Sequence, residues 1–217
     1  MSIGKYIQPK EATQIPEPAS ARFLFADTRM AWLWLLVRVY IGYQWLTAGF
    51  EKLTGYSITV GNTFGAKVGD SWIFTSHLGA AIQGFAHGGM AQATGAHAAA
   101  QGWYAWFLQN VVLPGSGFFA YLVTFGELLV GIGLILGVLT GIAAFFGVFM
   151  NMNFLLAGAV SINPIIGGLA IFLVLAWRVA GYWGVDRWLL PLLGTPWTGS
   201  LAAQDRRKAT SPQPATS

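Results

Sequence analysis

The chain has 217 residues and a formal net charge of +4, and 55% of its residues are hydrophobic whereas only 9% are charged. Soluble domains carry about 25% charged residues, so this composition excludes an ordinary soluble domain and predicts a polytopic membrane protein. The small positive charge is explained by basic residues flanking membrane spans, and we expect no nucleic-acid partner. The absence of cysteine excludes disulfides, thiolate nucleophiles and cysteine-bound zinc or iron–sulfur clusters.

Four apolar stretches have about the length that a membrane-spanning helix needs. They predict an all-α protein, a four-helix transmembrane bundle whose spans cover about 30–50, 117–136, 142–160 and 165–183. Residues 1–29 are expected to form an N-terminal tail without a signal peptide, since no apolar core is present. Residues 30–197 form the membrane domain, and residues 198–217 a polar, disordered tail.

The basic residues indicate the orientation of the chain. Lys5, Lys10, Arg22 and Arg29 precede the first span, and four more basic residues follow the last (Arg187, Arg206, Arg207 and Lys208). The connection 53–116 contains only Lys67 well inside it. The distribution predicts a multi-pass protein of the cell membrane with both termini in the cytoplasm.

The connection 53–116 is expected to be a helical extracytoplasmic loop. Its middle is too rich in Gln, His and Gly for a fifth span, and a fifth span would separate the two basic termini. The stretch GWYAWFLQNVVLP carries Trp103, Tyr104 and Trp106 in a pattern typical of an interfacial helix. His77, His87 and His97 are too widely spaced to predict a metal site.

The first span carries a stripe of unusual residues. Arg38, Gly42, Trp45, Gly49 and Lys52 are spaced four, three, four and three residues apart, which places them on one helix face. A charge near the bilayer centre costs roughly 2.5–3.5 kcal/mol on insertion scales, so we expect this face to point into protein. The two glycines would allow a neighbouring backbone to approach closely.

The other spans supply polar residues that could meet this stripe. Glu127 is the one acid of the second span, Asn151 and Asn153 lie in the third, and Arg178 lies in the fourth. An unpaired charge at this depth is implausible, so the sequence predicts that Glu127 bridges Arg38 and extends to Arg178. Two interpretations stay open at this point: a structural network that fixes helix register, or a site for a quinone carbonyl or a small anion.

Several segments together resemble the DoxX/DoxD family of four-helix membrane proteins. They are RVYIGYQWLTAGFEKL, FGELLVGIGLILGVLTGIAAFFGVFMNMNFLLAG and RVAGYWGVDRWLLPLLGTPW. The resemblance covers residues 30 to 197 apart from most of the outer loop. The family includes the small DoxD subunit of thiosulfate:quinone oxidoreductase, so the resemblance implies an oxidoreductase subunit in quinone-linked electron transfer, working with a second redox subunit.

On this hypothesis Glu127 and Arg38 are the candidate catalytic residues. The quinone or anion would be bound by Arg38, Trp45, Lys52, Glu127, Asn151, Asn153 and Arg178. Quinone is expected as a substrate, and no haem, flavin, iron–sulfur cluster or metal is expected in this chain, because the spans contain no histidine and no flavin motif. The alternatives are a non-catalytic accessory subunit of a larger respiratory or photosynthetic complex and, less favoured because no inverted repeat is visible, a small transporter.

Overall fold

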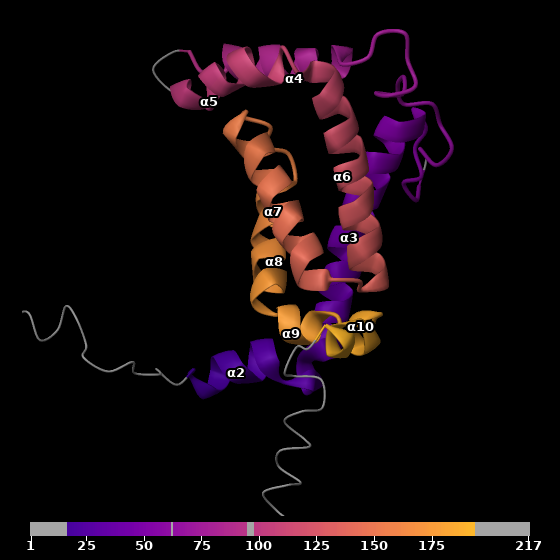
Figure 1. Cartoon of the computed structure of the whole chain (residues 1–217), viewed down its shortest axis with the longest axis vertical. Coiled ribbons are helices and arrows are strands. Elements are labelled where there is room, and N and C mark those ends of the chain that lie inside the picture. The colour runs from indigo at the N-terminus through magenta and orange to yellow at the C-terminus, as the bar shows by residue number, and fades with distance from the viewer. Residues whose placement is uncertain (1–16, 62, 95–97, 194–217) are drawn as a thin grey trace, which may run out of the picture.

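The computed structural model describes residues 17–61, 63–94 and 98–193, and the named elements in this part of the chain are helices (Figure 1). In chain order they are α2 (Ala19–Ala26), η1 (Thr28–Met30), α3 (Ala31–Thr54), α4 (Ala80–Ala91), α5 (Gly102–Phe107), η2 (Leu108–Val112), α6 (Ser116–Leu136), α7 (Thr140–Leu156), α8 (Asn163–Leu175), α9 (Trp177–Ala180) and α10 (Asp186–Leu192). Helices α3, α6, α7 and α8 run lengthwise and form what we call the helical body. The expectation of an all-α protein is confirmed for the described residues.

Helices α3 and α6 run antiparallel in close contact, and glycines make this possible. A Cβ atom at Gly131 would lie 2.6 Å from the backbone nitrogen of Leu46, and one at Gly42 would lie 3.0 Å from the Gly131 carbonyl oxygen. Gly49 sits equally close to the backbone nitrogen of Leu128, at 2.8 Å. The predicted close approach at Gly42 and Gly49 is therefore confirmed, since no larger side chain fits these crossings.

The apolar core of the helical body joins all four long helices. Its fully buried members include residues of α3, α6, α7, α8 and α9, namely Trp34, Ile41, Trp45, Val130, Leu134, Ala144, Ala170, Leu173 and Val179. A tight turn connects α6 to α7, in which Gly137 takes a φ of 68° and Leu139 a φ of 47°. The turn brings α7 back along α6. The stripe on α3 faces α6 through Gly42, Gly49 and Lys52, and its Trp45 reaches α7 near Gly147.

The fourth predicted span differs from the structure. We expected one helix over 165–183, but α8 ends at Leu175 and a separate short turn, α9, follows. Beyond α9 the backbone leaves the helix direction, and the amides of Val185 and Asp186 donate to the carbonyls of Leu136 and Gly137, at 3.1 and 2.8 Å. These carbonyls lie at the end of α6 and have no partner within it. By accepting from Val185 and Asp186 they hold the chain beside the end of α6, so the fourth helix does not continue.

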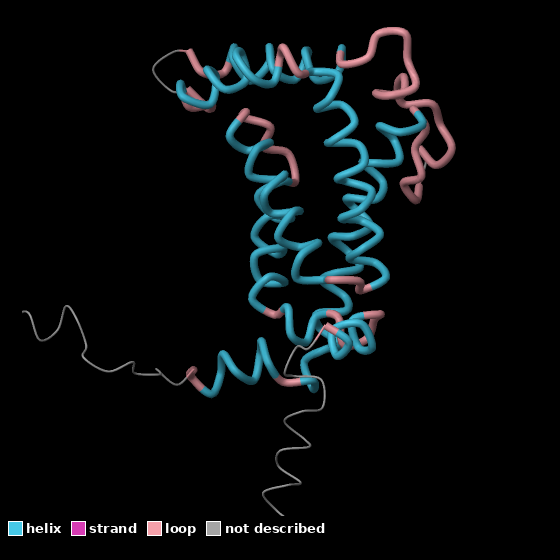
Figure 2. Tube along the Cα trace, viewed as in Figure 1, coloured by secondary structure: helices cyan, strands magenta, loops and turns pink. Residues whose placement is uncertain are grey.

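One end of the helical body, which we call the α4 end, is covered by α4, α5 and η2 (Figure 1). A second apolar cluster lies under them, formed by Ile73, Ile82, Ala86, Tyr104, Leu108, Val112, Ala120 and Ala157. Helix α4 has 12 residues, too few to cross a bilayer. The segment from Gly55 to Gly79 is mostly loop and runs beside the end of α3 (Figure 2). The helices expected in 53–116 are thus present.

The opposite end, the α2 end, carries α2, η1, α9 and α10. The helix α2 lies inside the segment 1–29 that the sequence suggested to be a tail, and it packs against α9. Residues 1–16 and the predicted tail 198–217 fall outside the described residues.

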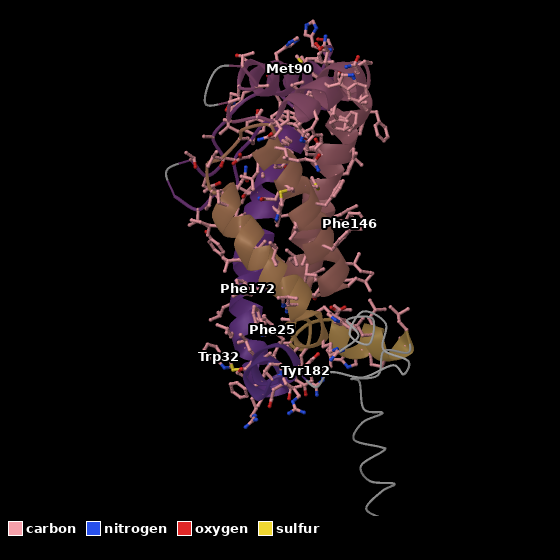
Figure 3. All side chains as sticks on the ribbon, turned by 90° about the vertical axis from the view of Figure 1, so that its left-hand side faces the viewer. Phe25, Trp32, Met90, Phe146, Phe172 and Tyr182 are labelled. Carbon is pink, nitrogen blue, oxygen red and sulfur yellow. The ribbon has the colours of Figure 1, made fainter. Side chains whose placement is uncertain are left out.

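Within the described part of the chain, α6 is the helix that is both long and apolar enough to cross a membrane. Helices α7 and α8 are apolar but shorter, and α3 has 24 residues but carries Arg38, Glu51 and Lys52. Large apolar side chains cover the outer faces of α6 and α7, such as Phe146, which is 52% exposed and points away from the body (Figure 3). Crossing by all four helices stays a prediction.

Candidate functional site

A buried ion pair connects α3 to the middle of α6. Lys52 Nζ donates to Glu127 Oε2 at 2.6 Å, and the Glu127 side chain is 2% exposed against 19% for Lys52. Gly49 makes the pair possible, because a Cβ atom there would lie only 3.1 Å from the Glu127 Cβ. Glu127 therefore lies against the α3 backbone one turn before Lys52. The lysine side chain reaches from the α4 end towards the carboxylate.

The surroundings of Lys52 leave two of its hydrogen-bond donors available. Its Nζ lies 5.0 Å from the ring centroid of Trp72, and the Trp72 amide donates to the Lys52 carbonyl at 2.8 Å, which fixes the ring over the ammonium. In the described part of the chain Glu127 Oε2 is the sole hydrogen-bond acceptor for Nζ. An ammonium has three donors, so two remain for a ligand or water. The sequence analysis did not single out Trp72, since it lies in a loop without a motif.

Four buried side-chain atoms make no hydrogen bond within the described residues: Arg38 Nε, Trp45 Nε1, Thr124 Oγ1 and Thr140 Oγ1. Arg38 and Thr140 lie near the turn between α6 and α7, whereas Trp45 and Thr124 share helix faces with Lys52 and Glu127. Trp45 shares the α3 face of Lys52, and its Nε1 would lie 3.4 Å from a Cβ atom at Gly147 of α7. Thr124 lies one turn from Glu127 on the buried face of α6. Buried donors normally have partners, so these two are candidates for contact with a ligand.

The predicted bridge from Glu127 to Arg38 is wrong. Arg38 instead donates from Nη1 to the carbonyls of Leu134 and Ile135, at 2.6 and 2.8 Å, and from Nη2 to the carbonyl of Trp183 at 2.8 Å. The first two carbonyls belong to the last turn of α6, where backbone acceptors are free and the helix dipole favours a cation. Arg38 thus points towards the α2 end while Lys52 reaches Glu127 from the α4 end.

Asp186 completes the Arg38 cluster and was missed in the sequence analysis. Its two carboxylate oxygens accept from the amides of Leu139 and Thr140, at 2.6 and 2.8 Å, which caps the start of α7. The residue is fully buried, and its charge interacts with that of Arg38. The one hint in the sequence was its place in the stretch GYWGVDRW. The cluster holds α3, the α6–α7 turn and the segment after α9 together.

Arg178 does not join the predicted network. It is exposed, lies 5.6 Å from the ring centroid of Trp177, and forms no ion pair within the described residues. Its helix, α9, has left the direction of α8, which carries the side chain to the surface of the α2 end.

Asn151 and Asn153 face different neighbours, and neither reaches Glu127. Asn151 is buried and donates to Asn163 Oδ1 at 3.3 Å, between α7 and the start of α8. Asn153 accepts at 3.1 Å from the hydroxyl of Tyr104, in α5, and so attaches the cap to α7. Burial raises the pKa of Tyr104 to about 12, which keeps this hydroxyl a donor.

Comparison with protein families gives a match to part of this arrangement. Residues 84–159 match the family model DoxX. Over these residues the chain is similar to the DoxX family of membrane proteins. No curated protein and no solved structure matches the chain.

The DoxX match runs from within α4 to just beyond α7. It contains Glu127, Asn151 and Asn153, whereas Lys52 and Arg38 lie outside it, on α3. The helices within the DoxX match therefore supply the buried carboxylate, and α3, outside it, supplies both cations.

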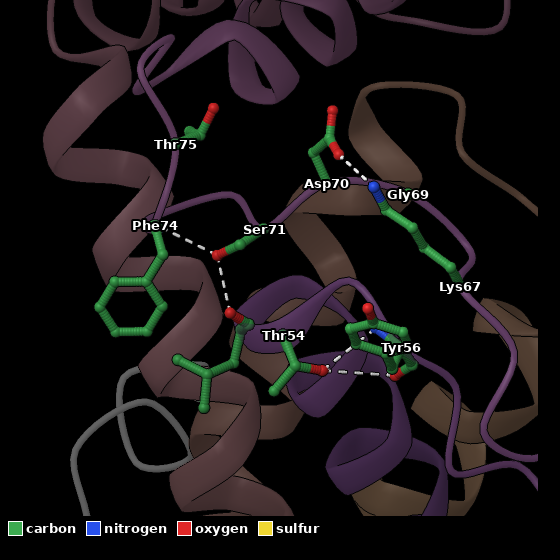
Figure 4. A pocket seen from close by; sticks show the side chains of 9 residues that line it. Thr54, Tyr56, Lys67, Gly69, Asp70, Ser71, Phe74 and Thr75 are labelled. Atoms are coloured by element: carbon green, nitrogen blue, oxygen red, sulfur yellow. Dashed lines mark hydrogen bonds and ion pairs between the residues drawn. The ribbon is translucent and has the colours of Figure 1, made fainter.

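A hollow of about 470 Å³ opens at the α4 end of the chain, beside the last turn of α3 (Figure 4). Thr54, Tyr56 and Ser71 line it, and Lys67 and Asp70 form an exposed ion pair at its edge, 3.0 Å apart. Ser71 donates to the Leu53 carbonyl at 2.7 Å, which holds the loop of Trp72 against α3. No group of three or more potential metal ligands occurs in the described residues.

Proposed function

We propose that the chain is an integral membrane subunit of a quinone-linked redox system, related in role to the DoxD subunit of thiosulfate:quinone oxidoreductase. In this proposal α3, α6, α7 and the α8–α9 segment each cross the cell membrane, with the α2 end in the cytoplasm. The distribution of charge supports the orientation, because Arg22, Arg29, Arg178 and Arg187 lie at the α2 end and only Lys52 and Lys67 at the other. The exposed apolar faces of α6 and α7 support membrane crossing.

The observation that carries the redox proposal is the Lys52–Glu127 pair with its unpartnered neighbours. A quinone is an apolar ring with carbonyl acceptors, and it needs a cavity wall that is mostly apolar with a few hydrogen-bond donors. Lys52 has donors to spare, and the buried Trp45 Nε1 has no partner. The two residues are seven positions apart on one face of α3, about 10 Å along the helix axis.

The roles of the residues follow from this geometry. Reduction of a quinone places negative charge on its oxygens, and an ammonium within hydrogen-bond reach stabilises that charge. Glu127, paired with Lys52, exchanges the proton that the reduced oxygen takes up. Arg38 is reassigned to anchoring the helices, since its guanidinium already serves three carbonyls. Electrons would come from a sulfur donor such as thiosulfate, handled with a partner subunit.

The test is the amount of quinone that stays with the purified chain. The protein is extracted gently from native membranes, and bound quinone per chain is measured by mass spectrometry for the natural chain, Glu127→Gln and Glu51→Gln. Glu51 is the matched control, because its partly buried carboxylate faces Thr59 and not Lys52. We expect retention to fall in Glu127→Gln alone. Absence of quinone from the natural chain, or equal retention in all three, would reject the proposal.

A second candidate is a non-catalytic accessory subunit of a larger membrane complex. The tight backbone contacts of Arg38 favour it, because they satisfy a buried charge without any ligand. The exposed phenylalanines of α7, Phe145, Phe146 and Phe149, would then contact neighbouring helices. Purification inside a large assembly, with no quinone assignable to this chain, would support it.

A further inference from the structure

Helix α2 is fixed to the α2 end of the helical body by one face. Phe25 stacks on Trp34 and on Phe172, with ring centroids 5.6 and 6.3 Å apart, and Figure 3 shows Phe25 beside Phe172. The Trp34 indole donates to the Leu24 carbonyl at 2.8 Å. The helix therefore lies across the ends of the long helices in a defined orientation (Figure 1).

The remaining face of α2 combines cations with exposed aromatic rings. Arg22 and Phe23 are exposed, and the Arg29 guanidinium lies 5.2 Å from the Phe23 ring centroid. Trp32, which begins the outer face of α3, is 56% exposed at the same end (Figure 3). Aromatic rings next to arginines are typical of segments that lie at the level of lipid headgroups.

A shallow hollow of about 480 Å³ lies on this face of α2, and Arg22, Phe23, Thr28 and Arg29 line it together with Asp27. Arg29 donates to Asp27 through Nε and Nη2, at 3.1 and 2.6 Å, and its Nη1 has no partner in the described chain. Arg22 forms no ion pair with any described carboxylate. The hollow thus presents guanidinium donors that its one acid does not satisfy.

We propose that this hollow binds the phosphate headgroup of an anionic phospholipid in the adjoining leaflet. The phosphate would accept from Arg22 and from the free Nη1 of Arg29, while Phe23 and Trp32 contact the acyl-chain boundary. A lipid fits better than a free anion, because the guanidinium donors stand next to apolar rings. The helix α2 also lies across the ends of the long helices that we propose cross the membrane. The proposal is independent of the quinone proposal.

Asp27 would compete with the phosphate for the Arg29 guanidinium, and this gives a second test of the proposal. Hydrogen bonds from Arg29 lower the pKa of Asp27, so its carboxylate stays charged at neutral pH. Asp27→Asn removes that charge and keeps an acceptor oxygen for the Arg29 amide that the natural residue caps. The variant frees the Arg29 guanidinium for phosphate without removing the cap of η1.

The experiment titrates the full-length chain in neutral detergent with dioleoylphosphatidylglycerol or dioleoylphosphatidylcholine and counts bound lipid by native mass spectrometry. A basic residue near a membrane surface changes affinity about fivefold. We expect phosphatidylglycerol to bind about fivefold more weakly to Arg22→Gln and more tightly to Asp27→Asn. Lys67→Gln, which removes an exposed cation at the opposite end, should bind like the natural chain.

Equal binding of the two lipids would overturn the proposal, as would an Arg22→Gln variant that cannot be distinguished from Lys67→Gln. A third arm adds inorganic phosphate at constant ionic strength. Displacement of phosphatidylglycerol by phosphate from the natural chain, but not from Arg22→Gln, would show a site for soluble anions and would also overturn it. Unchanged thermal unfolding of each variant in neutral lipid shows that the fold is intact.

Discussion

Lys52 and Arg38 lie on the same face of α3, 14 residues apart, and their charged groups bind different parts of α6. The Lys52 ammonium lies 2.6 Å from Glu127 Oε2, whereas the Arg38 guanidinium lies 2.6 Å from the Leu134 carbonyl in the last turn of α6. By helix rise their backbones are about 21 Å apart. The cations therefore serve two separate sites, one with a carboxylate that could exchange protons and one that joins backbone segments.

Substitutions of Lys52 and Glu127 are expected to have strongly non-additive effects on the free energy of unfolding. Lys52→Met leaves a buried carboxylate without its partner, and we expect the free energy of unfolding in detergent to fall by about 3 kcal/mol. Glu127→Gln leaves a partly exposed ammonium, so its cost should be smaller. The double variant should cost less than the sum of the two. A double-mutant cycle measures this coupling, and additive effects would mean that the two charges do not interact.

Substitution of Arg38 is expected to change the free energy of unfolding without changing the amount of bound quinone. A lysine ammonium carries its donors on one nitrogen, whereas the Arg38 guanidinium reaches the carbonyls of Leu134 and Trp183 from two, Nη1 and Nη2. We expect Arg38→Lys to lower the free energy of unfolding by about 2 kcal/mol. Bound quinone per folded chain should stay at the natural level. A variant of natural stability that loses quinone would return Arg38 to the binding site.

The sequence identified the buried face of α3 correctly but assigned its partners wrongly, and the reason is physical. Spacing along a helix reveals which residues share a face, because that depends on 3.6 residues per turn. It does not reveal which way a long side chain extends, and Lys and Arg can reach several ångströms along the axis. Arg38 binds backbone carbonyls that are free at the end of α6, and a list of the polar side chains in a sequence does not include such acceptors.

The fold shows the same division between what was predictable and what was not. The span predicted over 117–136 agrees with α6, because a continuous apolar stretch between glycine-rich turns has few alternatives. The sequence does not predict the break after Leu175, since the stretch that follows contains one charge, Arg178, and no proline. It depends on hydrogen bonds from Val185 and Asp186 to the end of α6, which are contacts between distant segments.

The crossing of α3 and α6 predicts opposite effects for two Gly→Ala substitutions. At Gly131 the new Cβ would lie 2.6 Å from the Leu46 nitrogen, so the helices must separate, and we expect a loss of about 2 kcal/mol. At Gly168, within α8, the Cβ meets nothing within 4 Å. Alanine there should stabilise the protein by about 0.5–1 kcal/mol through helix propensity. Thermal unfolding of the two variants in one detergent tests the pair, and equal effects would contradict the close crossing.

The attachment of the cap to α7 predicts a stability change at high pH. Burial raises the pKa of Tyr104 to about 12, against about 10 in an unfolded chain. The native state therefore keeps the proton longer than the unfolded state, and the stability that this provides is complete below pH 10 and is lost as the pH rises to 12. Tyr104→Phe removes the hydrogen bond to Asn153 and should cost about 1 kcal/mol at neutral pH.

In the same variant the fall in stability between pH 10 and 12 should become shallower, because one shifted group no longer titrates. Tyr56→Phe is the matched control, since it removes a phenol that is 48% exposed in the loop at the same end. Chemical unfolding followed at several pH values compares the three proteins. A slope in Tyr104→Phe that equals those of the natural chain and of Tyr56→Phe would show that the Tyr104 hydroxyl is open to water and that the cap does not close over α7.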